Sequence, residues 1–185
     1  MDRQLEAKYA GMSGGKSMNV TVIEGTEQDI DSWMELVQSV RRTFPGLETE
    51  AALKEHRNTV LEFMNQKRAI CVKAGNKIIG VLLFSIKYNM ICCLAVSNEY
   101  RKQGIGSILL AYALEKLDRT QPITVSTFRE EDEKGAAPRA LYKKYGFIPD
   151  ALIEEFGYPN QKFVLYPNGR TMEIHGENYS GATAL

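Results

Sequence analysis

The stretch RKQGIG, residues 101–106, places two glycines one residue apart, behind two basic residues. An apolar run at residues 91–96 precedes it and a long apolar segment follows it, so the pattern predicts a turn between a strand and a helix. Free N–H groups at a helix start carry about half a unit of positive charge, and glycine lets an anion approach them closely. This spacing therefore predicts a seat for phosphate. A tight strand–helix turn that binds no ligand is the alternative.

Two other phosphate-binding patterns are not supported. A dinucleotide-binding loop needs a third glycine at position 109, where Leu109 stands. Residues 10–17, AGMSGGKS, fit a loose nucleotide-loop pattern, but such a loop must follow a strand and open a helix. Here no strand pattern precedes the stretch, and the residues after it alternate as a strand does. We therefore do not assign nucleotide hydrolysis.

The elements that must position the glycine loop can be read from hydrophobic periodicity. The predicted helices cover residues 26–44, 49–66, 105–119 and 139–146. The predicted strands cover residues 18–25, 69–73, 77–86, 91–96, 123–128, 148–156 and 161–166. The early strands are too many for a regularly alternating parallel sheet, so the predicted fold class is α/β with a mixed (α+β) sheet. We expect one domain over residues 18–167, a flexible leader over 1–17 and a peripheral tail over 168–185.

A second block, ALYKKYGF at residues 140–147, follows the loop with one predicted strand between them. Together the two blocks resemble the GNAT superfamily of acyl-CoA-dependent N-acyltransferases. The loop of that family reads Gln/Arg-x-x-Gly-x-Gly/Ala, and its later helix ends in Ala-Leu-Tyr-x-x-x-Gly-Phe. The family often has proline before the loop, where this chain has Ser97 or Asn98. The resemblance covers about residues 19–166 and implies a central mixed sheet, flanked by helices, that splays between its fourth and fifth strands.

The resemblance also implies acetyl-CoA as co-substrate, no metal, and direct attack of an amine on the thioester without an acyl-enzyme. The strand before the loop would hold the acyl arm and the loop would hold the pyrophosphate. The implied cofactor-binding residues are Leu94, Ala95, Val96, Arg101, Lys102, Gln103, Gly104, Ile105, Gly106 and Ser107. Tyr142 occupies the general-acid position of the family, or else is a packed aromatic, and we expect Tyr145 to be a packing residue.

A general base is not assigned by the sequence. The strand at residues 91–96 carries no carboxylate. The acidic run at residues 130–133 either attracts a cationic amine or is a solvated loop face. His56 either reaches the acceptor pocket or lies on the surface. A chain of water molecules is a further route for the proton.

Composition narrows the class of partner. Lys plus Arg and Asp plus Glu each number 23, so the net charge is zero and gives no basic excess for nucleic acid. Three cysteines, none in a CxxC pair, and two histidines make a zinc cluster improbable, and we expect buried free thiols. No apolar run reaches the length of a membrane span, and the first residues contain no apolar signal core, so we expect a cytoplasmic protein.

The sequence favours an N-acetyltransferase that acts on a primary amine of a small molecule or a peptide, with a homodimer as a possible assembly. A non-catalytic acyl-CoA-binding module is the alternative, since the loop would serve either. The acceptor itself is not identified, because in this superfamily its pocket is built from the segments that carry the weakest signatures.

Overall fold

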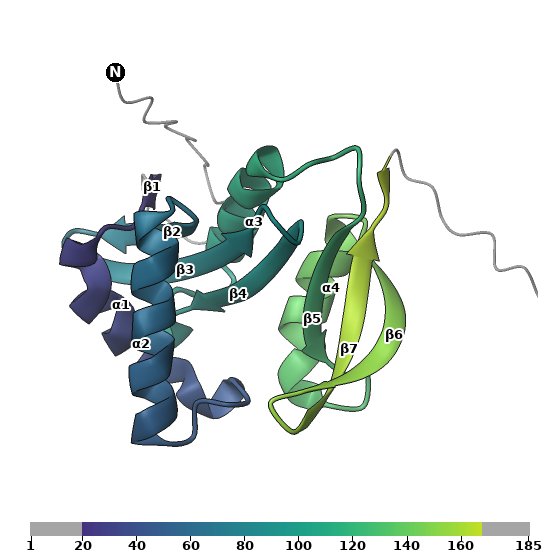
Figure 1. The fold of residues 1–185 in the computed structure, drawn as a ribbon, viewed down its shortest axis with the longest axis horizontal. Helices are drawn as coiled ribbons and strands as arrows, with labels where there is room; N and C mark the ends of the chain where they lie inside the picture. The colour runs from purple at the N-terminus through teal and green to yellow at the C-terminus, as the bar shows by residue number, and fades with distance from the viewer. Residues whose placement is uncertain (1–19, 168–185) are drawn as a thin grey trace, which may run out of the picture.

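The computed structural model describes residues 20–167 (Figure 1). Its strands are β1 (Val22–Glu24), β2 (Ala69–Ala74), β3 (Lys77–Ser85), β4 (Met90–Val96), β5 (Ile123–Phe128), β6 (Ile148–Glu155) and β7 (Tyr158–Leu165). Its helices are α1 (Ile30–Val40), α2 (Glu50–Asn65), α3 (Ile105–Lys116) and α4 (Ala136–Lys144). Short 3₁₀ turns η1 (Glu27–Asp29), η2 (Arg41–Thr43), η3 (Asn98–Tyr100) and η4 (Glu133–Gly135) join them. The predicted α/β fold class is confirmed.

All seven strands form one mixed sheet in the order β1-β2-β3-β4-β5-β7-β6. Every neighbouring pair is antiparallel except β4 and β5, which are parallel and are joined through α3. That pairing consists of two residue pairs, Met90 with Thr124 and Ile91 with Val125. Beyond them the two strands diverge, as Figure 1 shows. We call this region, residues 92–96 of β4 facing residues 126–128 of β5, the strand divergence; the splay that the resemblance implied is confirmed.

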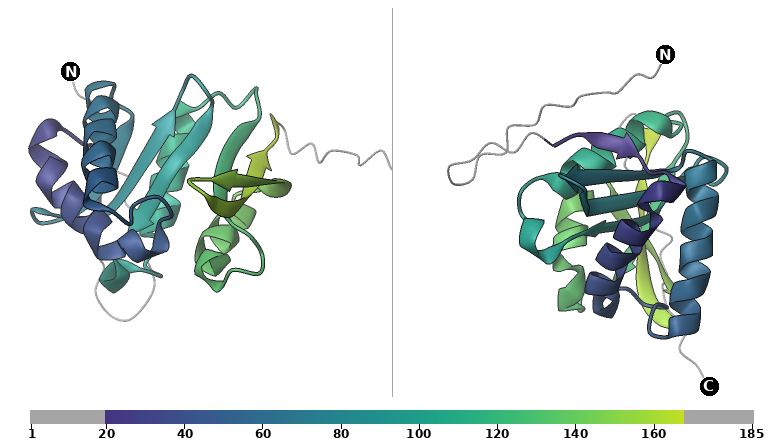
Figure 2. Two further views of the ribbon diagram at one scale, coloured as in Figure 1. Left: turned by 60° about the horizontal axis from the view of Figure 1, so that its bottom comes forward. Right: turned by 90° about the vertical axis from the view of Figure 1, so that its left-hand side faces the viewer.

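Helices cover the two faces of the sheet unequally. The helices α1 and α2 pack on β1–β4, and α3 and α4 pack on the opposite face (Figures 1 and 2). The buried side chains accordingly form two clusters. One joins α3 to both halves of the sheet and includes Tyr142 and Phe163, and the other lies under α1 and α2 around Trp33. In Figure 1 the face of β5, β7 and β6 that points away from α4 has no helix over it.

Most predicted element bounds differ from the structure by one to three residues; β7, for example, begins at Tyr158 and not at residue 161. Three further differences are more informative. The single predicted helix over residues 26–44 is divided into η1, α1 and η2, because the chain tightens to 3₁₀ geometry at both ends. The predicted helix from Arg139 begins three residues earlier, at Ala136. Pro138 therefore lies in its first turn, where a missing N–H costs no hydrogen bond. The first strand is shorter than predicted, and residues 18–19 of that prediction, the leader and the tail lie outside the described residues.

Candidate functional site

The loop between β4 and α3 has the backbone that the glycine pattern predicts. Lys102 and Gly104 adopt the left-handed region, with φ of 59° and 83°. Gly104 is the N-cap of α3, and the first bond of the helix runs from Ile108 N–H to Gly104 C=O, at 3.0 Å. The N–H groups of Ile105, Gly106 and Ser107 therefore have no acceptor within the helix. They form a cluster of donors at the positive end of the helix dipole.

The two glycines serve different purposes. A Cβ at Gly104 would meet nothing within 4 Å, so this glycine is required for its backbone angle and leaves the space in front of the donors open. A Cβ at Gly106 would lie 3.3 Å from Leu141 and 3.7 and 3.8 Å from Leu94 and Val96. Gly106 thus keeps α3 close to β4 and α4.

The polar side chains of the loop bond to its own backbone. Arg101 Nε donates to the C=O of Val96, at 3.3 Å, and Gln103 Nε2 donates to the C=O of Glu99, at 3.2 Å. Arg101, Lys102 and Gln103 are all exposed. The guanidinium and ammonium charges therefore stand at the rim of the donor cluster, where an anion would meet them.

Strand β4 presents its predicted binding residues at the strand divergence. Cys92 has no pairing partner on β3, because the register shifts between Leu83 and Phe84 and forms a bulge there. Beyond the bulge, Leu94 and Val96 pack toward α3, and Cys93 and Ala95 pack toward α1 and α2. Since β5 has already turned away, the backbone of residues 92–96 has no strand partner on that side among the described residues. These groups are available to an extended ligand arm.

The expectation of three buried thiols was wrong for two of them. Cys71 is buried, but Cys92 is exposed and Cys93 is half-buried, because the divergence removes the neighbouring strand that would have covered them. Enough protein still surrounds both thiols that burial raises the pKa of Cys92 to about 11 and that of Cys93 to about 12. Both are therefore protonated thiols at neutral pH and poor nucleophiles.

Tyr142 lies on α4 and is 4% exposed. Its ring packs at 5.7 Å from Phe147 and 6.4 Å from Phe163, measured between ring centroids. Burial, and to a lesser degree the Cys93 thiol, raises the pKa of Tyr142. A phenol in this setting stays protonated at physiological pH and can donate a hydrogen bond.

Tyr145, for which the sequence predicted only a packing role, also makes a hydrogen bond. Its hydroxyl donates to the C=O of Ser107, at 2.7 Å. This bond ties the end of α4 to the first turn of α3, where the donor cluster lies. Tyr145 therefore helps to position the loop.

The acidic run after β5 is not simply a solvated loop face. Glu130, Glu131 and Glu133 are exposed, but Asp132 accepts a hydrogen bond from Tyr158 Oη on β7. Arg139 is 6% exposed, and its guanidinium donates to the backbone C=O groups of residues 128, 129, 130 and 132. One buried side chain thus fixes the path of the whole loop.

Replacement of Arg139 by methionine is expected to lower the free energy of unfolding by about 2–4 kcal/mol, because it leaves one buried and three partly buried carbonyl groups without this donor. Thermal or urea unfolding measures this. The control is Lys143→Met. Lys143 and Arg139 each contact the Glu130 carboxylate at 3.4 Å, but Lys143 does so from an exposed position. We expect that control to cost less than about 1 kcal/mol. Equal losses in the two variants would contradict the role given to Arg139.

His56, the remaining base candidate from the sequence, lies on a helix that packs against a more distant strand. His56 is half-buried on α2, which packs against β2, two strands away from β4. Its Nε2 is buried without a hydrogen-bond partner among the described residues, and burial lowers the pKa of His56. Sequence reasoning did not single out Ser126 and Glu155, whose side chains are hydrogen-bonded at 3.2 Å. The sequence signal for this pair is the alternation of β5. Val125 is buried on one face of the sheet, so Ser126, the next residue, points to the other face.

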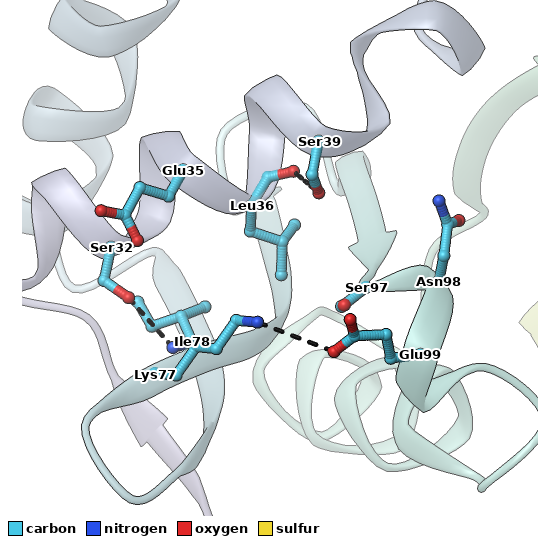
Figure 3. A pocket seen from close by; sticks show the side chains of 9 residues that line it. All are labelled: Ser32, Glu35, Leu36, Ser39, Lys77, Ile78, Ser97, Asn98 and Glu99. Carbon is cyan, nitrogen blue, oxygen red and sulfur yellow. Dashed lines mark hydrogen bonds and ion pairs between the residues drawn. The ribbon is translucent and has the colours of Figure 1, made fainter.

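A polar cavity of about 310 Å³ lies between α1 and the adjoining ends of β3 and β4 (Figure 3). Its lining residues are Ser32, Glu35, Leu36, Ser39, Lys77, Ile78, Ser97, Asn98 and Glu99. Lys77 and Glu99 form an ion pair at 3.7 Å, and Ser32 accepts from the N–H of Ile78, at 3.0 Å. None of the residues predicted to bind cofactor lines this cavity, so it is distinct from the donor cluster of α3.

Two further properties concern residues 20–167 alone. Within this range no three His, Cys, Asp or Glu side chains are placed to hold a metal ion together. In the same range, every helix is too short or too polar to cross a bilayer.

Comparison with known proteins gives a family and a fold. The model of a family described as "Acetyltransferase (GNAT) family" matches residues 33–147. A GNAT-family acetyltransferase from Bacillus cereus ATCC 10987 is 24% identical, with a TM-score of 0.62, over 80% of this chain and 96% of that one. A PaiA N-acetyltransferase from Thermoplasma acidophilum, solved in complex with coenzyme A, is 15% identical, with a TM-score of 0.59, over 78% and 98%. Ard1 from Thermoplasma volcanium is 18% identical, with a TM-score of 0.60, over 80% and 97%. Comparison with curated protein sequences gives no match.

Proposed function

Because the chain belongs to the GNAT acetyltransferase family, we propose that it transfers the acetyl group of acetyl-CoA to a primary amine of a small molecule or a peptide. One observation carries the proposal. The open N-terminus of α3, with Gly104 at its cap, stands directly after a strand whose neighbour has diverged. A diphosphate and an extended acyl arm need these two features side by side.

The residues of the chain fit such a ligand. The space in front of Gly104 is open, and the N–H groups of residues 105–107 have no acceptor within the helix. These groups would donate to phosphate oxygens, with Arg101 and Lys102 adding charge at the rim. The backbone of Leu94, Ala95 and Val96 would bond to the amides of the arm. Accepting such a bond at Val96 C=O would require Arg101 Nε to share or release that carbonyl.

Bound acetyl-CoA supplies an activated thioester and a sulfur leaving group. Tyr142 stabilises the negative charge that develops on that sulfur by donating a hydrogen bond. Its hydroxyl has no hydrogen-bond partner in the described part of the chain, and its raised pKa keeps the proton in place until it is needed. The thiols of Cys92 and Cys93 take no covalent part, since both are protonated at neutral pH.

Calorimetric titration is the first test of this function. We expect acetyl-CoA to bind with a Kd in the micromolar range and adenosine triphosphate, the control, to bind far more weakly, because it cannot fill the strand divergence. Primary amines should then release free coenzyme A, detected as a thiol. Absence of acetyl-CoA binding would contradict the proposed function, and binding without thiol release from any amine would favour a non-catalytic acyl-CoA-binding module.

A further inference from the structure

The side chains of Ser126 and Glu155 form a hydrogen-bonded pair on the side of the sheet away from α3 and α4. Val125 packs toward those helices, so Ser126, the next residue of β5, points to the other face. Phe128, two residues after Ser126, points to the same face and is paired with Asn160 of β7. Tyr158, two residues before Asn160, also points there and is paired with Glu155 of β6. Ser126 and Glu155 therefore share this face. The Ser126 hydroxyl donates to Glu155 Oε1, at 3.2 Å, and both residues are half-buried.

This contact exists because the β6–β7 hairpin curls. Strand β7 lies between β5 and β6 in the sheet order, yet the carboxylate of Glu155 reaches Ser126. The register of the hairpin shifts between Pro149 and Leu152, and Figure 1 shows its tip swinging toward the connection between α1 and α2. There a Cβ on Gly46 would lie 2.8 Å from the ring of Phe156. The uncovered face is therefore bounded by that connection.

The pair stands at the level where the strands separate. The last pairing of β4 with β5 joins Ile91 to Val125, so Ser126 is the first residue of β5 past it. Across the divergence are the bulged Cys92 and then Cys93, which packs toward the α1 and α2 side. Leu94, whose backbone we expect to hold the acyl arm, follows immediately. Ser126 and Glu155 thus lie beside the place where the reacting carbon would be, and on the side from which an acceptor can approach.

Glu155 lies among charged groups on several elements, one of which, Lys134 on η4, stands over the ring of Tyr158, with its Nζ 5.9 Å from the ring centroid. The other charged and titratable groups around Glu155 have bonding partners of their own or are neutral. On β7, Lys162 is paired with Asp150 at 2.6 Å and Tyr158 bonds to Asp132. After β5, Arg129 donates to the backbone C=O groups of Asn160 and Ile153. Across the divergence, Cys92 and Cys93 are neutral thiols. Within the described residues Glu155 makes no ion pair, only the bond from a neutral hydroxyl. A half-buried carboxylate in this state favours a cationic ligand.

We propose that Glu155, oriented by Ser126, binds the ammonium group of the acceptor and takes its proton. This inference rests on the proposed function and supplies the general base that β4 lacks. Glu155 accepts one proton from the ammonium, which frees the nitrogen lone pair. The C–N bond then forms as the C–S bond of the thioester breaks, and the nitrogen releases its second proton to solvent. Tyr142 stabilises the departing sulfur, which takes a proton from solvent, and Glu155 returns its own proton to solvent. The substrate class is a primary alkylamine, and an alcohol of the same shape is excluded because it brings no positive charge.

The test uses n-butylamine as the acceptor probe and n-butanol as its neutral counterpart, with thiol release from acetyl-CoA followed from about pH 6 to 10. We expect Glu155→Gln to lower kcat/KM for n-butylamine by about 10²-fold at neutral pH. The loss should shrink toward pH 10, where an alkylamine with a pKa of about 10.4 becomes neutral without help. Ser126→Ala should give a smaller loss. Calorimetry should give the wild-type affinity for acetyl-CoA in both variants.

Glu154→Gln is the matched control. Glu154 is the exposed neighbour of Glu155 on β6, and its substitution removes the same single negative charge. It should behave as the wild type. The proposal is overturned by wild-type rates in Glu155→Gln, by an equal loss in Glu154→Gln, by a loss that does not depend on pH, or by thiol release with n-butanol as fast as with n-butylamine. Failure of the wild type to accept n-butylamine while binding acetyl-CoA also overturns it. Failure to bind acetyl-CoA at all overturns the proposed function instead.

Discussion

Replacing Gly104 with valine is expected to weaken acetyl-CoA binding by about 10²-fold or more while the protein remains folded. Valine at φ of 83° is strained, and relief of that strain moves the N–H groups of residues 105–107 away from a common focus. The valine side chain would also occupy the open space in front of them, where no other atom lies within 4 Å of its Cβ. Calorimetric titration with acetyl-CoA measures the loss.

Gly75→Val provides a control for strain alone. Gly75 also has a positive φ, 60°, and open space around it, but it lies in the turn between β2 and β3. We expect the two variants to lose similar stability in thermal unfolding, and only Gly104→Val to lose affinity. Wild-type affinity of Gly104→Val for acetyl-CoA would contradict the proposed phosphate-binding site at the N-terminus of α3.

Replacement of Tyr142 by phenylalanine is expected to lower kcat by about 10²-fold and to leave acetyl-CoA affinity unchanged. The hydroxyl has no hydrogen-bond partner among the described residues, so its removal leaves the packing of the ring on Phe147 and Phe163 intact. Because burial raises the pKa of Tyr142, its ionisation should not limit the wild-type rate below about pH 10. Single-turnover thiol release, compared with calorimetry, separates chemistry from binding.

Tyr145→Phe distinguishes an acid from a positioning residue. That variant loses the bond to Ser107 C=O and should weaken cofactor binding more than turnover. If Tyr142→Phe keeps the wild-type kcat, the acid role belongs elsewhere and Tyr142 is a packed aromatic.

The loop and its flanking elements were predictable because their signals are local. Two glycines between an apolar strand and an apolar helix determine the cap at Gly104 and the start of α3 within the same ten residues. The splay beside β4 was less accessible, since hydrophobic periodicity reports which face is buried and not which neighbour is paired. It came from the resemblance of residues 101–106 and 140–147 to a known family.

The contact of Ser126 with Glu155 was not predictable, for a physical reason. Ser126 and Glu155 are 29 residues apart, and a whole strand lies between theirs in the sheet. Their contact depends on how far a hairpin curls, which no single residue specifies. Arg139 was missed for a similar reason. An arginine beside an acidic run reads as a surface charge, whereas its partners are backbone carbonyls that carry no sequence signature.

The short pairing of β4 with β5 also affects the distance between the two halves of the sheet, β1–β4 and β5–β7. Where strands are bonded, their spacing is fixed at about 4.8 Å. Beyond Ile91 no such bonds hold β4 and β5 together, and the halves are joined instead by the apolar cluster beneath α3, to which Tyr142 and Phe163 belong. The width of the opening is therefore governed by side-chain volume and not by hydrogen-bond length. Under the proposed function, the side-chain volume packed in this cluster decides how thick an acyl chain the opening accepts.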